Sequence, residues 1–216
     1  MSGHFLNISA WERKQQFEFF LGYELPYFNI CADVDVSETL AWCRANSASF
    51  SRATWFCVQR AINAIEPFRY RLRDDRVYVF DRISLRTTIA NEDGSFRFGA
   101  FPYGESFAEF NRLADASLAA PPSAELGSQE EDDAVIHGST LPWIHFKSIS
   151  HPRKLSEQDC VPKISIGKFQ ESAGRILMPI AVDVHHALMD GLHVSRFFEH
   201  MSTDLAQPAS VLRESA

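Results

Sequence analysis

The sequence predicts an α/β protein, and three observations support this prediction. The residues from Ile176 to Val184 are almost all apolar, which is typical of a β-strand buried on both faces. Directly after them, apolar side chains recur at helical spacing, at Leu192, Val194, Phe197, Phe198 and Met201. Strand and helix patterns also alternate along the rest of the chain. We therefore expect a β-sheet packed with helices.

The first half of the chain contains strand and helix patterns in turn. A helix is expected over about residues 10–21, with Ser9 as its N-cap. A strand follows over Tyr27–Val36, then a helix over about 38–47 capped by Ser37, and a second helix over about 52–65. Residues 68–73 and 76–80 alternate with a period of two around Asp74-Asp75, which indicates a strand–turn–strand unit.

The second half has the same character. Strands near 83–91 and 95–101 flank a hairpin signal, and a helix covers about 105–117. The residues from Gly138 to Phe146 predict a turn followed by a strand, and residues 163–169 and 175–184 predict a hairpin. Residues 119–134 are polar and acidic, so we expect an exposed loop within a single domain over residues 1–216.

Composition limits the classes of function. The chain has 216 residues of which 45% are hydrophobic, enough for a sizeable core, and its eighteen phenylalanines predict aromatic packing, an apolar pocket or a buried subunit interface. A net charge of −7 argues against nucleic acid as a partner. Three arginines share one face of a strand, but acidic residues flank them, so a solvated strand face is expected there. These arginines are Arg69, Arg71 and Arg73.

The cysteines and the N-terminus predict a cytoplasmic location. Four cysteines show neither a CxxC pair nor the spacing of metal ligands, so we expect reduced thiols and no metal. They are Cys31, Cys43, Cys57 and Cys160. The first residues show no signal-peptide pattern, and no apolar run reaches membrane-spanning length, so no membrane partner is expected.

A histidine pair marks the candidate active site. His185 and His186 stand where the buried strand gives way to the helix, a position in which a side chain is held rigidly and still faces a cavity. Gly191 permits the sharp turn, and Asp190 stands at a helix N-terminus, where the dipole favours negative charge. The other histidines, taken singly, are expected to be packed or solvated residues without chemistry. These are His4, His137, His145, His193 and His200.

The stretch His-His-x-x-x-Asp-Gly resembles the active-site motif of the CoA-dependent acyltransferases. Two further segments are similar to the chloramphenicol acetyltransferases within that superfamily. Residues 11–20, WERKQQFEFF, resemble a W-x-R-[RK]-x-x-F-E-x-[YF] helix, and residues 139–146, STLPWIHF, resemble S-x-[LN]-P-W-[VI]-x-F. In isolation they predict only an amphipathic surface helix and an ordinary strand start. The resemblance covers nearly the whole chain at the family's usual length, which disfavours dihydrolipoyl acyltransferases and condensation domains.

The resemblance implies a fold, an assembly and an activity. It implies a two-layer sandwich of a mixed β-sheet packed with helices, and a homotrimer with active sites at the subunit interfaces. It implies an enzyme that uses acetyl-CoA to acetylate a hydroxyl of chloramphenicol and so inactivates the antibiotic, without a metal. Two alternatives stay open: the same chemistry on another small hydroxylated or amine acceptor, or a trimeric relative that binds CoA without turnover.

The resemblance also assigns catalytic roles. His186 matches the general base, which lies four residues before the motif aspartate, and a neutral imidazole suits this task at neutral pH. Ser139 matches the serine that stabilises the tetrahedral oxyanion. Arg13 is expected to pair with Asp190 and hold the motif in place, and His185 is expected to be structural. Transfer is direct, without an acyl-enzyme.

Binding residues follow from the same resemblance, although ordinary packing explains single aromatic residues nearly as well. The acceptor pocket is expected to contain Phe20, Tyr27, Phe28, Phe96, Ile149, His151 and Ser165. Trp143, Lys168 and Phe169 are expected near CoA. The chain departs from the family at four places. It is one residue shorter between Pro26 and Phe28, and Ile149 and a polar His151 stand where apolar acceptor-pocket residues are usual. Ser49 and Ser51 replace a lysine and a tyrosine near CoA, and Asp183 replaces a glutamine and places a carboxylate close to the base.

Overall fold

The computed structural model describes residues 2–91, 93–119, 133–153 and 159–213. Most of the acidic segment that was predicted as an exposed loop, residues 120–132, lies outside the described residues. Within the described ranges, no helix is long and apolar enough to cross a membrane.

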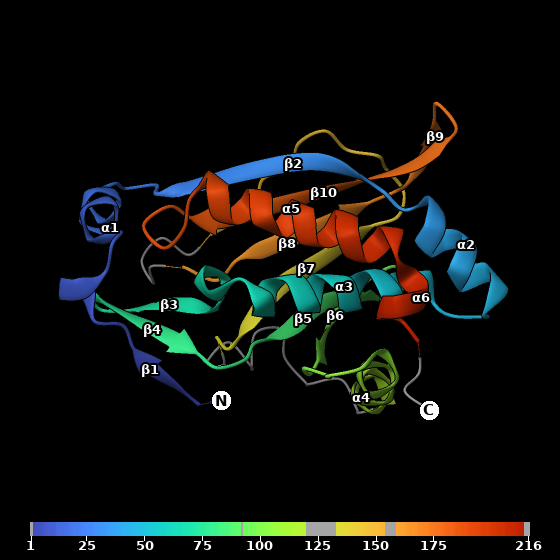
Figure 1. Ribbon diagram of the computed structural model, residues 1–216, viewed down its shortest axis with the longest axis horizontal. Helices are drawn as coiled ribbons and strands as arrows, with labels where there is room; N and C mark the ends of the chain where they lie inside the picture. The colour runs from blue at the N-terminus through green and yellow to red at the C-terminus, as the bar shows by residue number, and fades with distance from the viewer. Residues whose placement is uncertain (1, 92, 120–132, 154–158, 214–216) are drawn as a thin grey trace.

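A seven-stranded sheet forms one layer of the molecule (Figure 1). Its strand order is β2-β10-β8-β7-β5-β6, and β9 pairs with the outer part of β10. The β7 strand runs parallel to β5 and β8 and the other pairs are antiparallel, which confirms the mixed sheet. The bounds are β2 Tyr27–Asp35, β5 Ser84–Ala90, β6 Phe96–Phe101, β7 Val135–Leu141, β8 Lys163–Gly167, β9 Gln170–Ser172 and β10 Arg175–His185.

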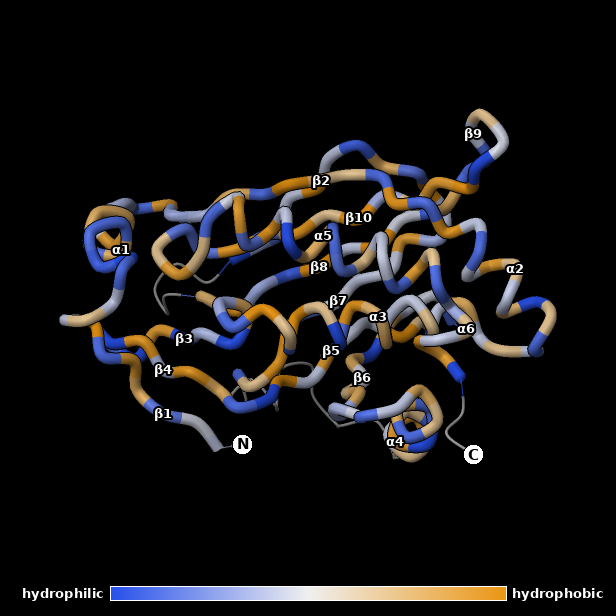
Figure 2. The backbone as a smooth tube through the Cα atoms, in the orientation of Figure 1, coloured by the Kyte–Doolittle hydropathy of each residue, from blue (hydrophilic) through white to orange (hydrophobic). Residues whose placement is uncertain are grey.

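Helices form the second layer. Figure 1 shows α3 (Phe50–Ala64) and α5 (Gly191–Ala206) lying across one face of the sheet. At the ends of this layer are α2 (Ser37–Ala45), α6 (Pro208–Val211) and α4 (Phe107–Ala119). Hydrophobic and hydrophilic residues alternate along α5 in Figure 2, as expected for a helix with one buried face. The predicted two-layer α/β sandwich is confirmed.

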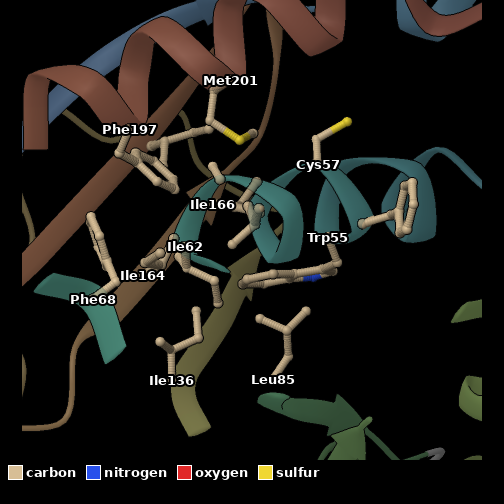
Figure 3. Packing of buried hydrophobic residues seen from close by; sticks show 14 of the residues in the cluster. Trp55, Cys57, Ile62, Phe68, Leu85, Ile136, Ile164, Ile166, Phe197 and Met201 are labelled. Atoms are coloured by element: carbon tan, nitrogen blue, oxygen red, sulfur yellow. The ribbon is translucent and has the colours of Figure 1, made fainter. Parts of the chain in front are cut away.

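The main core lies between this helical layer and the sheet. Figure 3 shows Trp55 and Ile62 from α3 and Phe197 from α5 packed over Leu85, Ile136 and Ile164 from the strands. All six side chains are buried. Because burying one large apolar side chain contributes about 1.5–3 kcal/mol, this cluster alone holds the helices on the sheet firmly.

A smaller unit packs beside the motif. The strands β1 (Gly3–Phe5), β4 (Arg76–Phe80) and β3 (Tyr70–Arg73) form a three-stranded sheet next to α1 (Lys14–Leu21) and the short 3₁₀ turns η1 (Ile8–Ala10) and η2 (Glu66–Arg69). Phe17 of α1 and Tyr70 of β3 share a second buried cluster with Ala187 and Leu188 of the motif turn. The N-terminal helix is thereby attached to the histidine motif.

Two predicted helix starts were wrong. The first helix begins at Lys14 rather than near residue 10, because residues 8–10 form a separate 3₁₀ turn whose N-cap is Asn7 rather than Ser9. The helix after β2 begins at Ser37 itself, whose amide and hydroxyl both donate to Oδ1 of Asp35, at 3.0 and 2.6 Å. In both places a neighbouring Asx side chain provides the local hydrogen bonds that were assigned to a serine.

The prediction for residues 138–146 was also wrong. The strand comes before the Pro142-Trp143 step rather than after it, since β7 ends at Leu141. Pro142 has no amide hydrogen with which to continue the pairing to β8.

The prediction of a solvated strand face at Arg69, Arg71 and Arg73 was wrong for the middle residue, Arg71. Arg71 is fully buried, and its guanidinium donates to four backbone carbonyls. These carbonyls, of Phe68, Tyr70, Asp133 and Val135, join β3 to the start of β7. Buried charge is tolerated where every donor finds an acceptor in this way.

Candidate active site

The histidine motif forms the turn between β10 and α5. Its backbone is fixed from both sides: the N–H of His186 donates to the carbonyl of Pro26 at 2.7 Å, and the N–H groups of Leu188 and Met189 donate to the carbonyl of His185. The first bond ties the turn to the start of β2, the neighbouring strand. The side chain of His186 therefore leaves from a rigid backbone.

The ring of His186 is clamped in one orientation and one tautomer. Its Nδ1 atom lies 3.2 Å from the carbonyl oxygen of Met189. Because a carbonyl only accepts, Nδ1 carries the proton in the neutral ring and Nε2 keeps a lone pair. The ring stacks on Phe20 at a centroid distance of 3.8 Å and packs against Phe28 at 4.6 Å. Among the residues that the structure describes, Nε2 has no hydrogen-bond partner, and a half-buried imidazole in this state is suited to accept a proton.

His185 is a packed residue, as expected. Only 4% of it is exposed, its Nδ1 accepts the N–H of Ala187, and its ring meets Tyr27 edge-on at 5.1 Å. Burial, together with the nearby charge of Arg153, lowers the pKa of His185 to about 4. The ring is therefore neutral at neutral pH, and it supports the turn.

The predicted pairing of Arg13 with Asp190 is confirmed. Nε of Arg13 lies 3.1 Å from Oδ2 of Asp190, and the two remaining nitrogens donate to the carbonyls of His186 and Ala187, both at 3.4 Å. Burial opposes ionisation of Asp190, but His193 and Arg13 outweigh it and lower the pKa of this carboxyl. The carboxylate also accepts the N–H of Leu192 and so caps α5.

His193 belongs to the same network, which single-residue reasoning from the sequence missed. Its Nδ1 accepts the N–H of Asp190 at 3.1 Å and lies 3.0 Å from Oδ1 of Asp190. The first of these contacts and the bond that the backbone N–H of His193 donates to the Asp190 side chain form a capping box, a pair of reciprocal bonds between the N-cap residue and the third helical residue. The spacing Asp-x-x-His at a helix start is the signal that pointed to it.

Ser139 lies on the sheet face that α3 and α5 leave uncovered. Its neighbours Gly138 and Thr140 face α3: a Cβ on Gly138 would meet Trp55 at 2.6 Å, and Thr140 accepts the indole N–H of Trp55. Side chains alternate along a strand, so Ser139 points to the other face. There it stands in register with Ser165 on β8.

One chain does not bring Ser139 and His186 together. Ser139 pairs with Ser165, which pairs with Ala181 of β10, five residues before His186. Two strand spacings of about 4.8 Å and five residues of about 3.3 Å place the Cα atoms of Ser139 and His186 roughly 19 Å apart. The residues that the sequence predicts to act on one carbon thus lie far apart within a single copy.

The predicted acceptor residues form two groups and two separate positions. Phe20, Tyr27 and Phe28 surround the two motif histidines. Ser165 and His151 lie together near Ser139, with Ser165 Oγ 2.9 Å from His151 Nε2. Phe96, half exposed on the edge strand β6, lies apart from both groups within one chain, and Ile149 is partly exposed in the segment after β7.

The predicted CoA residues lie together at one corner. The amide of Lys168 donates to the carbonyl of Ile144 at 2.8 Å, which joins the segment of Trp143 to that of Lys168 and Phe169. Phe169 packs edge-on against Phe50, the first residue of α3, and Trp143 is 77% exposed.

A cavity of about 270 Å³ begins at the same N-terminus of α3. Ser49 and Ser51 line it together with Arg52, which pairs with Asp115 at 2.5 Å. The sequence indicated that a lysine near CoA is lost where Ser49 stands. The structure shows that a different cation, Arg52, lines the cavity close to that position.

Comparisons with known proteins agree with this geometry. The family model described as chloramphenicol acetyltransferase matches residues 1–202. Chloramphenicol acetyltransferase 3 of Escherichia coli is 24% identical over 90% of this chain and 93% of its own length, and the chloramphenicol acetyltransferase of Bacillus pumilus is 26% identical over 88% and 87%.

Solved structures point the same way. A chloramphenicol acetyltransferase structure superposes with a TM-score of 0.88 at 30% identity, covering 94% of this chain and 100% of that one. The dihydrolipoamide acetyltransferase of Azotobacter vinelandii shares the fold, with a TM-score of 0.63 at 14% identity over 91% of this chain and 88% of that one. The chain therefore belongs to the chloramphenicol acetyltransferase family, and it is an acyltransferase.

Proposed function

We propose that this protein is an acetyl-CoA-dependent O-acetyltransferase whose acceptor is chloramphenicol. The observation that carries the proposal is the clamped ring of His186, which has its proton on Nδ1 and a lone pair on Nε2. This is the state that a general base needs at neutral pH. It stands in the motif of a family whose named members acetylate chloramphenicol. We propose the cytoplasm as its location, because acetyl-CoA is an intracellular metabolite.

The chemistry proceeds by direct transfer. Nε2 of His186 takes the proton of the acceptor hydroxyl while that oxygen attacks the carbonyl carbon of the thioester. The C–O bond forms and the carbonyl oxygen becomes an oxyanion. The intermediate then collapses, the C–S bond breaks, and the sulfur leaves as CoA thiol with the proton from the imidazolium. General-base help of this kind contributes on the order of 10²–10⁴ in rate.

Ser139 donates a hydrogen bond to the oxyanion in this proposal, an interaction typically worth about 2.7–4 kcal/mol. Because Ser139 and His186 of one chain are roughly 19 Å apart, the serine of one copy works with the histidine of another. This supports the trimer with sites at subunit interfaces. Large exposed apolar residues around the motif, which another copy would cover, support it further: Phe19, Tyr23, Leu25 and Leu192.

In this proposal acetyl-CoA binds at the corner formed by Trp143, Lys168 and Phe169. Exposed aromatic rings offer an apolar surface to the pantetheine arm or the adenine, and a lysine offers a cation to a phosphate. No metal takes part in this mechanism.

A second acceptor class is favoured by one observation. His151 places an imidazole next to Ser165, on the face where Ser139 lies. An acceptor other than chloramphenicol, small and hydroxylated or carrying an amine, would be acetylated by the same residues.

The experiment is release of CoA thiol from acetyl-CoA by the purified protein, with and without chloramphenicol. We expect release only with the drug, and a fall of about 10²–10⁴ in kcat for His186→Ala. His200→Ala, on the exposed side of α5, is the matched control and should keep full activity. Release that does not depend on any acceptor, or that survives His186→Ala, contradicts the proposal. Release with other alcohols but not with chloramphenicol favours the second acceptor class.

A further inference from the structure

His151 and Ser165 form a polar pair beside the candidate oxyanion serine. Ser165 is fully buried, and its Oγ lies 2.9 Å from Nε2 of His151. Ser139 and Ser165 are register partners on adjacent strands, so their Cα atoms are about 4.8 Å apart and their side chains share one face. The half-buried imidazole of His151 thus lies within about two side-chain lengths of Ser139.

The charges next to this pair balance one another. Arg153 pairs with Asp183 and Asp159, and Lys163 pairs with Asp159. Two cations thereby meet two carboxylates. The carboxylate of Asp183, which the sequence placed close to the catalytic base, is held by Arg153 and also lies 3.5 Å from the amide of Asn29. Among the described residues, these four charged groups are thus paired with one another, and none of them is left over for an ionic ligand.

The imidazole of His151 is neutral, and only one of its two ring nitrogens has a hydrogen-bond partner among the described residues. Burial lowers the pKa of His151, with Lys163 and Arg153 acting in the same direction against Asp183. One ring nitrogen is satisfied by Ser165, and within the part of the chain that the structure describes the other, Nδ1, has no hydrogen-bond partner. In either tautomer of the neutral ring, Nδ1 of His151 can bind a further ligand: it donates if it carries the proton and accepts if it does not.

The position of the pair determines what that ligand is. In acyl transfer the carbon next to the oxyanion also carries the oxygen of the acceptor. A group this close to Ser139 therefore contacts the acceptor or the acyl group. The acetyl group has no polar atom besides its carbonyl oxygen, so the group that remains for an imidazole to bind is on the acceptor.

We propose that His151, held by Ser165, is a specificity-determining residue that binds a second, neutral hydroxyl of the acceptor. This inference rests on the proposed function, in which Ser139 faces the reacting carbon. It narrows the acceptor to molecules in which a hydroxyl lies close to the one that is acetylated. An acceptor with an additional carboxylate or ammonium is disfavoured, because burying an unpaired charge costs several kcal/mol and the nearby ions are already paired.

The test uses acceptor pairs that differ by one hydroxyl. The first pair is 1-phenyl-1,2-ethanediol and 2-phenylethanol, and the second is chloramphenicol and its 1-deoxy analogue. For each, kcat/KM is measured by thiol release with the wild-type chain, His151→Leu, His151→Gln and Ser165→Ala. His200→Leu is the control for a histidine change away from the site, and thermal unfolding confirms that each variant folds.

We expect the wild-type chain to prefer the diol in at least one pair by roughly tenfold, the size of one hydrogen bond. His151→Leu abolishes the preference while keeping turnover of the mono-alcohol, His151→Gln retains part of it, and Ser165→Ala weakens it because the ring loses its support. Equal kcat/KM for both members of each pair in the wild-type chain, or a preference unchanged in His151→Leu, overturns the inference alone. Discrimination between the phenyl alcohols without turnover of chloramphenicol supports the inference and rejects the proposed acceptor. Absence of release with every acceptor overturns both.

Discussion

Nε of Arg13 lies 3.1 Å from Oδ2 of Asp190, and the pair joins two residues that are 177 positions apart in the chain. The same guanidinium donates to the carbonyls of His186 and Ala187. An ion pair thus fixes the turn that carries the candidate base, and none of its atoms is needed in the reaction. Half-buried pairs of this kind locate backbone more than they add net stability.

Two substitutions at Asp190 will separate the effect of its charge on Arg13 from its effect as the N-cap of α5. Asp190→Asn keeps a good N-cap for α5 but loses the charge facing Arg13, whereas Asp190→Ala loses both. We expect the free energy of unfolding to fall by about 1 kcal/mol in Asp190→Asn, allowing for its partial exposure, and by about 2 kcal/mol in Asp190→Ala. Both variants should lower kcat about tenfold or more and leave the KM for acetyl-CoA nearly unchanged. Urea unfolding and steady-state kinetics measure the two effects.

The matched control is a double-mutant cycle with Arg13→Met. If the brace acts through the pair, the losses in kcat from the two single variants will not add in Arg13→Met/Asp190→Asn. Additive losses would mean that each residue acts on its own.

His193 makes the cap of α5 sensitive to acid. Its neutral Nδ1 accepts the N–H of Asp190, and burial lowers its pKa, with Arg13 and Arg196 acting in the same direction and Asp190 against them. Protonated His193 cannot accept this bond. The unfolded chain takes up the proton near the ordinary value of about 6.5, so stability is full above that pH and is lost as the pH falls from about 6.5 through the lower pKa of the folded state.

The variant His193→Gln tests this prediction, because glutamine at the third helical position also completes a capping box and does not titrate. We expect its free energy of unfolding to fall less steeply than that of the wild-type chain between pH 6.5 and 5, and its kcat at neutral pH to stay within a few-fold. His200→Gln, exposed on the same helix, should follow the wild-type curve. Identical curves for His193→Gln and the wild-type chain would remove His193 from the acid response.

Trp143→Ala is expected to weaken binding of acetyl-CoA without harming the fold. The indole is 77% exposed, so its removal leaves no cavity, and it lies at the corner that Lys168 and Phe169 share. If the ring covers the cofactor, the KM for acetyl-CoA rises about tenfold, the size of one aromatic contact with a ligand, and kcat changes little. Phe5→Ala, on the exposed β1 strand, is the comparison. An unchanged KM for acetyl-CoA in Trp143→Ala would place the cofactor elsewhere.

The fold was predictable where local patterns carry the information. The apolar run from Ile176 to Val184 lies within β10, and the helical spacing after it became α5. Each pattern reflects which residues of one strand or one helix are buried, and this information is present in the local sequence. The contact of Arg13 with Asp190 came only from the family resemblance, because no local pattern signals a bond across 177 residues.

Other features depend on contacts between segments and stayed hidden for that reason. The alternation around Arg71 predicted a solvated face, yet carbonyls from two segments of the chain satisfy its guanidinium inside the protein. The bond between His151 and Ser165 joins a loop to a buried strand position. The family resemblance placed both residues at the acceptor pocket, but no local pattern signals the bond between them. Such partners become visible only when the topology places them side by side.

The distance between Ser139 and His186 leads to a last prediction, that two inactive variants restore activity when combined. Ser139→Ala retains the base and His186→Ala retains the serine. If each site takes its histidine from one copy and its serine from the next, a mixed assembly contains sites with both groups intact. In random trimers three quarters are mixed and each has one complete site in three, so about a quarter of the wild-type activity is expected after unfolding and refolding the variants together at equal concentrations.

The control in this experiment is the same variants refolded separately and then combined, which should stay inactive while the copies do not exchange. A second control mixes His186→Ala with the double variant Ser139→Ala/His186→Ala, which offers no intact histidine and cannot recover. Recovery in the first mixture alone would place the active site between copies. No recovery, with trimers confirmed by light scattering, would require Ser139 and His186 to act at separate places, and the oxyanion role of Ser139 would then have to be given up.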